Sequence, residues 1–136
     1  MKRSSAASCL IAALPLLFAA HAMATPHLRC EVVYAGSSHI VEAAPGTDPY
    51  ATKSVDIDGR FSFKAIMLGA GTRLDAIKLY AYYQTRRQPI LIQEAKYLPP
   101  FTYSDVPDSL TGHQYLYAGP LERELQYGCT LTEVKP

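Results

Sequence analysis

Apolar and polar residues alternate along most of the chain, which is the pattern of β-strands that bury one face. The segments that this pattern predicts as strands are 28–35, 39–43, 54–68, 73–84, 89–98, 113–118 and 122–134. Asp58-Gly59 divides the third segment with a strong hairpin or bulge signal. Only 72–83 could instead form a short helix, and its tyrosine and isoleucine content favours a strand.

Turn residues separate these short segments throughout. Pro45-Gly46 and Asp48-Pro49 mark one connection, and a proline-rich loop runs over 98–107. Many short strands divided by Gly and Pro turns are typical of a sandwich or a barrel. Because neither an internal repeat nor a linker interrupts the pattern, we expect a single all-β domain over residues 25–136.

The first 24 residues have the three-part order of an export signal. Lys2 and Arg3 precede an apolar run over 6–20, and Ala22-Met23-Ala24 follows as a small-x-small cleavage pattern. The run is shorter than the roughly 20 residues that span a bilayer, although an uncleaved anchor helix is the alternative. The sequence therefore predicts a cleaved signal peptide and a mature start at Thr25. The chain also contains no Asn, hence no N-glycosylation sequon, which fits a bacterial periplasmic protein; secretion is the alternative.

Charge and composition exclude several classes of partner. Removing the signal leaves 112 of the 136 residues, with 11 Lys and Arg (13 less Lys2 and Arg3) against 12 Asp and Glu, a net charge of about −1. No run of like charges gives the concentrated positive surface on which nucleic-acid binding depends. No second apolar stretch has spanning length, so we expect no membrane insertion of the mature chain.

Two cysteines remain once Cys9 leaves with the signal: Cys30 near the mature start and Cys129 near its end. In an oxidising compartment an isolated pair is expected to form a disulfide. Both lie in apolar alternation on the first and last predicted strands, so the bond would join the chain ends. The 99-residue separation corresponds to about 4.7 kcal/mol in the chain-entropy model. A redox-active pair is the alternative, but Cys-x-x-Cys spacing is absent.

Tyr127-Gly128-Cys129 places a tyrosine two residues before the second cysteine, which resembles the tyrosine corner of the immunoglobulin fold. The cysteines are farther apart than in antibody domains, and the chain has no Trp to pack on the bridge. The resemblance therefore supports a small Greek-key or immunoglobulin-like β-sandwich closed by one disulfide, without membership of that family.

Metal and catalytic motifs are weak. His27, His39 and His113 are widely separated, and Asp56-Ile57-Asp58-Gly59 is only a fragment of a calcium loop, followed by Arg60 and Phe61. An amino-terminal copper site at His27 fails because Pro26 has no amide proton to lose. No Gly-x-Ser-x-Gly elbow is present. We therefore expect a non-enzymatic protein without metal or cofactor.

Aromatic residues are the candidate partner-binding groups. Tyr80 and Tyr82 are expected to face outward beside Lys78, while Phe101 and Tyr103 flank the proline-rich loop. Tyrosine suits protein interfaces but is also a good strand residue, and Phe101 could instead cover the open end of the sandwich. The sequence thus predicts an exported binding or accessory module for another envelope or secreted protein. The alternative is a small-ligand or glycan-binding protein, and the oligomeric state and strand order stay open.

Overall fold

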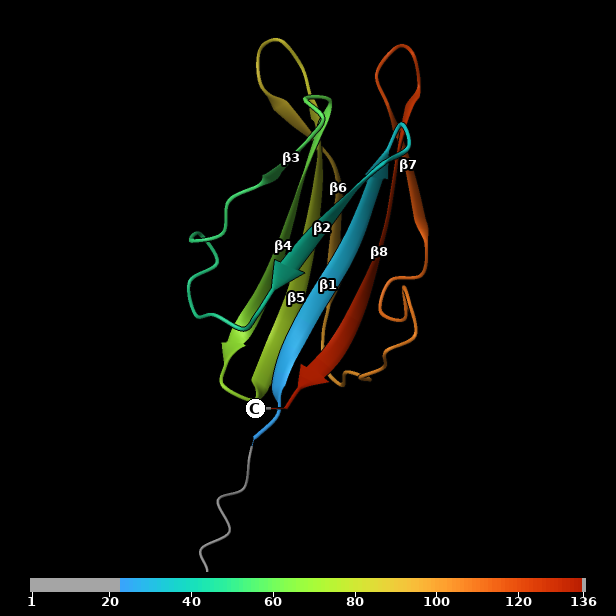
Figure 1. Cartoon of the computed structure of the whole chain (residues 1–136). Coiled ribbons are helices and arrows are strands. Elements are labelled where there is room, and N and C mark those ends of the chain that lie inside the picture. The colour runs from blue at the N-terminus through green and yellow to red at the C-terminus, as the bar shows by residue number, and fades with distance from the viewer. Residues whose placement is uncertain (1–22, 136) are drawn as a thin grey trace, which may run out of the picture.

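The computed structural model describes residues 23–135, which form two four-stranded antiparallel sheets packed together as a sandwich (Figure 1). Sheet A has the order β2-β1-β8-β7, and sheet B has the order β3-β4-β5-β6. Most of the predicted signal peptide (1–22) lies outside the described residues. The eight strands are β1 (Thr25–Tyr34), β2 (Ser37–Ala43), β3 (Val55–Ile57), β4 (Phe61–Ala70), β5 (Arg73–Gln84), β6 (Pro89–Tyr97), β7 (Gln114–Ala118) and β8 (Arg123–Val134).

Within each sheet, hairpins join strands that are consecutive in sequence, and β8 returns to pair with β1. The chain passes between the sheets twice, over 44–54 and over 98–113; we call the second stretch the crossing segment. The small β-sandwich is confirmed, but its strand order corrects the Greek-key expectation. A Greek key needs a long connection that returns a fourth strand beside the first of three hairpin-linked strands. Tight turns such as Ala35-Gly36 and Asp58-Gly59, whose residues adopt positive φ, join neighbours instead.

The core lies between the two sheets and is made of the inward positions of their alternating strands. Phe63 of β4 packs against Tyr127 of β8 with ring centroids 4.9 Å apart, and the Tyr127 hydroxyl donates to Gln93 of β6. Burial raises the pKa of Tyr127 to about 12. Tyr127 therefore faces the core, and its hydroxyl links the two sheets.

The predicted disulfide between Cys30 and Cys129 is confirmed. The two residues are direct partners in the β1–β8 register, with Cα atoms 4.0 Å apart. The bond therefore lies within one sheet, unlike the inter-sheet bridge of immunoglobulin domains. The Cys129 N–H donates to Thr111 Oγ1 at 2.8 Å, and its carbonyl accepts from the Leu110 N–H at 3.1 Å. Cys129 thus directs its backbone away from β1 and toward the crossing segment.

The crossing segment covers the edge of β8 beyond the end of β7. The Ser104 N–H donates to the Leu131 carbonyl at 3.0 Å, and the Asp108 N–H donates to Thr130 Oγ1 at 3.0 Å. Phe101 and Tyr103 are half-buried and pack against the core. This position agrees with the alternative in which Phe101 covers the open end of the sandwich.

Candidate functional site

The sequence-predicted aromatic residues lie in two separate places. Phe101 and Tyr103 belong to the crossing segment and contact the core, and burial raises the pKa of Tyr103. Tyr80 and Tyr82 lie together on the outer face of sheet B, with nearly parallel rings whose centroids are 6.4 Å apart. The four residues therefore do not form one surface.

Tyr80 and Tyr82 face outward as expected, but other side chains partly cover them. The Lys64 ammonium lies 5.0 Å from the Tyr80 ring centroid and 5.8 Å from that of Tyr82. Burial, and next the nearby Glu94 carboxylate, raise the pKa of Tyr80 above its ordinary value. Because both rings are half-buried and a cation already occupies their faces, this pair offers a partner limited aromatic area.

The most exposed tyrosines of the two sheets lie on the outer face of sheet A. Tyr115 and Tyr117 of β7 are 56% and 60% exposed. The Tyr115 ring meets the His113 ring edge-on at 4.9 Å between centroids. The Tyr117 hydroxyl donates to Glu124 Oε2 at 2.5 Å. Contacts with neighbouring side chains therefore hold both rings in position while leaving them open to solvent.

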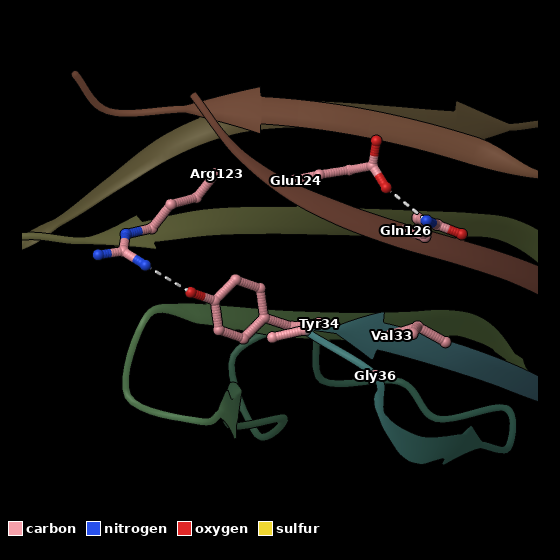
Figure 2. A pocket seen from close by; sticks show the side chains of 7 residues that line it. Val33, Tyr34, Gly36, Arg123, Glu124 and Gln126 are labelled. Carbon is pink, nitrogen blue, oxygen red and sulfur yellow. Dashed lines mark hydrogen bonds between the residues drawn. The ribbon is translucent and has the colours of Figure 1, made fainter. Parts of the chain in front are cut away.

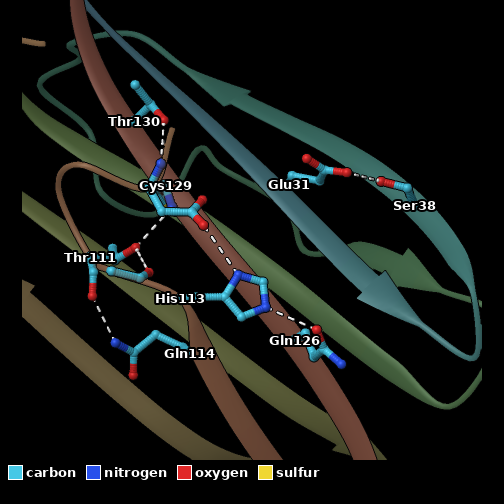
Figure 3. A network of polar contacts seen from close by, with 10 residues as sticks. Glu31, Ser38, Thr111, His113, Gln114, Gln126, Cys129 and Thr130 are labelled. Carbon is cyan, nitrogen blue, oxygen red and sulfur yellow. Dashed lines mark hydrogen bonds and ion pairs between the residues drawn. The ribbon is translucent and has the colours of Figure 1, made fainter. Parts of the chain in front are cut away.

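Polar contacts connect the side chains next to these rings, and Figure 3 shows the part of them centred on His113 and Gln126. His113 Nδ1 lies 3.1 Å from Asp108 Oδ2, and His113 Nε2 lies 2.9 Å from Gln126 Oε1. The Gln126 amide nitrogen donates in turn to Glu124, which also accepts from Tyr117. We call these five side chains the His113 network.

The network favours protonated His113. Glu124 accepts from the amide nitrogen of Gln126, so the Gln126 oxygen is left facing the imidazole. Both ring nitrogens then meet acceptor oxygens, an arrangement that only the doubly protonated ring satisfies in full. The hydrogen bonds with Gln126 and then Asp108 accordingly raise the pKa of His113 above its ordinary value. This face therefore gains the positive charge of His113 at a higher pH than an isolated histidine would.

An open hollow adjoins the network near the end of the sandwich (Figure 2). Val33, Arg123 and Glu124 line it, and Arg123 donates to the Tyr34 hydroxyl at 2.9 Å. Glu124 belongs both to the hollow and to the His113 network, so the two are continuous. The hollow offers an open depression beside the exposed tyrosines, lined by both apolar and charged residues.

The two outer faces carry opposite charge. Sheet A presents Glu31, Glu42 and Glu124 on its outer positions, with Asp108 beside them, against Arg29 and, when it is protonated, His113. Sheet B presents Lys64, Lys78 and Lys96 on its outer positions, against Asp56 and Glu94. The surface around Tyr115 and Tyr117 is therefore acidic.

Within residues 23–135, no group of three or more His, Cys, Asp or Glu side chains could hold a metal ion. No helix in the same range is long and apolar enough to cross a membrane. No protein-family model, curated protein or solved structure matches this chain. The arrangement of its own residues carries the functional argument.

Sequence reasoning did not select Tyr115 and Tyr117 as candidates, although the chain contains a signal for them. Leu116 stands between them, and a residue that faces the core turns both of its neighbours outward. Their cross-strand partners Gln126 and Glu124 are polar, which also indicates a solvent-facing position.

Proposed function

We propose that this protein is an exported, non-enzymatic binding module that recognises another protein through the outer face of sheet A. The observation that carries the proposal is the pair Tyr115 and Tyr117, exposed and fixed in position within an acidic surface. The partner that suits this surface presents Lys or Arg side chains. Export to the periplasm is part of the proposal and depends on the signal peptide that the sequence predicts.

The chemistry of the face supports a basic partner. Tyrosine rings give large contact areas, and their faces attract guanidinium and ammonium groups. Glu31 and Glu124 supply carboxylates on neighbouring strands, and opposite charges across an interface speed association and exclude wrong partners. Because Glu124 and His113 already restrain the two rings, a partner that docks on them orders few side chains on binding.

The shape of the face favours a protein over a small ligand. Small-molecule sites bury most of the ligand in a concave pocket that is mainly apolar. Here the rings stand on a sheet face, and the adjoining hollow is open to solvent rather than enclosed, with both apolar and charged residues in its lining. An extended protein surface can contact the rings, the hollow and the carboxylates at the same time.

Capture from envelope extract tests the proposal with three immobilised proteins. These are the wild type, Tyr115→Ala/Tyr117→Ala, and Tyr80→Ala/Tyr82→Ala as the matched control on the opposite face. We expect the wild type and the control to retain the same basic protein, and the sheet A variant to lose it. Retention by the sheet A variant, or loss only with the sheet B variant, would contradict the proposal.

A thermal-shift screen of the same proteins with glycans and metabolites separates the alternative function, because a ligand that binds the native state raises its stability. We expect no compound to stabilise the wild type more than the Tyr115→Ala/Tyr117→Ala variant. A glycan that does so would favour the ligand-binding alternative.

A further inference from the structure

β6 is an edge strand of sheet B, and among residues 23–135 it pairs with β5 alone. Its outer positions carry Glu94 and Lys96, both exposed, which lie opposite Tyr80 and Lys78 in the β5–β6 register. Its last part, residues 93–97, contains no proline and no inward-facing charge, two of the devices that commonly protect an edge strand from pairing. The outward charges of Glu94 and Lys96 oppose pairing only in registers that bring like charges together.

The direction of the backbone groups follows from the hydrogen bonds of the neighbouring strands. The Met67 carbonyl of β4 accepts from the Gly46 N–H, on the side of β4 away from β5. The backbone N–H and C=O groups of successive residues point to alternate sides of a strand, so those of Lys64 and Ile66 point toward β5. The backbone groups of their partners, Tyr80 and Lys78, point toward β4. Leu79 lies between Lys78 and Tyr80, so its backbone N–H and C=O groups point toward β6 and form a hydrogen-bonded pair with those of Ala95.

The same alternation on β6 turns the N–H and C=O groups of Glu94 and Lys96 toward the free edge. Within residues 23–135, no hydrogen bond in the structure reaches these backbone groups. The edge therefore offers a second strand two hydrogen-bonding positions, Glu94 with a negative side chain and Lys96 with a positive one.

We propose that two copies of this chain pair antiparallel through β6, with Glu94 of each copy opposite Lys96 of the other. Glu94 of one copy and Lys96 of the other both direct their backbone groups outward, so in this register they form a hydrogen-bonded pair. Each such pair makes two backbone hydrogen bonds and one ion pair. The neighbouring registers place Glu94 on Glu94, or Lys96 on Lys96, and like charges directly opposite are unfavourable. The charges thus select one symmetric register.

Ala95 lies on the two-fold axis of this dimer. It faces inward and forms a pair that is not hydrogen-bonded, the type in which Cα atoms approach to about 4.5 Å and side chains come closest. A methyl side chain fits this close approach. Since the axis is perpendicular to the sheet, the two copies of sheet A lie on the same side of the dimer. The inference goes beyond the proposed function, since it concerns the other sheet and would make the Tyr115–Tyr117 face bivalent.

Sedimentation velocity of protein purified from cells that express the full chain tests the dimer. We expect the wild type to dimerise at concentrations up to about 100 µM. Glu94→Lys and Lys96→Glu should each weaken dimerisation at least tenfold, because each places like charges across the interface. Glu42→Lys on the edge strand of sheet A is the matched control and should leave it unchanged.

Exchanging the two charges between Glu94 and Lys96 tests the ion pairs most directly. The double variant Glu94→Lys/Lys96→Glu restores opposite charges and should dimerise like the wild type. An equal mixture of the two single variants should form a heterodimer, because every pair across it is then complementary. A wild type that stays monomeric, single variants that still dimerise, or a mixture that stays monomeric would overturn the proposal. Near-ultraviolet circular dichroism verifies that each variant is folded.

Discussion

The carboxylate of Asp108 lies directly against the backbone of Gly128, so that a Cβ added to Gly128 would lie 1.8 Å from Asp108 Oδ1. Asp108 itself adopts a φ of 59°, and its N–H donates to Thr130 at 3.0 Å. Only glycine at residue 128 leaves room for this carboxylate, which in turn holds His113. Gly128, the middle residue of Tyr127-Gly128-Cys129, thus provides the space in which the crossing segment packs against β8.

Gly128→Ala should therefore displace Asp108 and lower the free energy of unfolding by about 1–3 kcal/mol, as overpacking commonly does. Urea denaturation measures the change. Gly46→Ala is the control, because a Cβ there meets open space and should change stability by less than about 0.5 kcal/mol. Equal stability of wild type and Gly128→Ala would show that Asp108 is not held as described.

His113 should give a measurable pH dependence of stability. Its pKa is raised in the folded protein, so protonated His113 stabilises the fold. That contribution is fully present below the ordinary histidine pKa of about 6.5 and is lost as the pH rises through the raised value. The stability difference between wild type and His113→Gln should therefore be larger at about pH 5.5 than at about pH 8.5.

NMR titration of the His113 imidazole verifies the cause of this effect. Gln126→Met removes the largest contribution to the shift and should bring the pKa of His113 down toward its ordinary value. An unchanged pKa in this variant would show that the Gln126 oxygen does not face the ring.

Loss of the disulfide should destabilise the protein strongly. Cys30→Ala/Cys129→Ala frees a loop of 99 residues in the unfolded chain, and removal of a native disulfide from a small domain typically costs about 2–5 kcal/mol. Denaturation with and without dithiothreitol measures the effect. Reductant should lower the stability of the wild type but not that of the variant; equal sensitivity of both proteins would contradict this explanation.

The predicted signal peptide implies a defined mature chain. Mass spectrometry of protein from the periplasmic fraction should find an N-terminus at Thr25, which is also the first residue of β1. Intact mass should in addition show no free thiols at Cys30 and Cys129. A protein that keeps residues 1–24 would refute cleavage.

The strands could be predicted because they depend on local alternation, and the disulfide could be predicted because only Cys30 and Cys129 remain beyond the predicted signal peptide. Alternation over 28–35 predicts a strand that buries one face, and the structure buries Leu28, Cys30 and Val32 completely. The strand order could not follow in the same way. Which strands pair depends on contacts between residues far apart in the sequence. A turn at Gly36 predicts a hairpin but does not show which other strands join the same sheet.

The site was harder to predict because exposure depends on distant residues. The pattern correctly predicted that Tyr80 and Tyr82 face outward. It could not show that Lys64, on the neighbouring strand, lies over both rings. Asp108 and His113 meet only because a positive φ at Asp108 and a glycine on β8 bring the crossing segment close. Neither relationship is visible as a spacing in the sequence.

The affinity of the captured partner for wild-type and Tyr115→Ala/Tyr117→Ala protein is the measurement that tests the proposed function most directly. Interface aromatics that dominate binding contribute at least about 2 kcal/mol, so the dissociation constant should rise more than tenfold in the variant. It should also rise with added salt, because the partner is basic and the face is acidic. A dissociation constant that is the same for both proteins would contradict recognition through the outer face of sheet A.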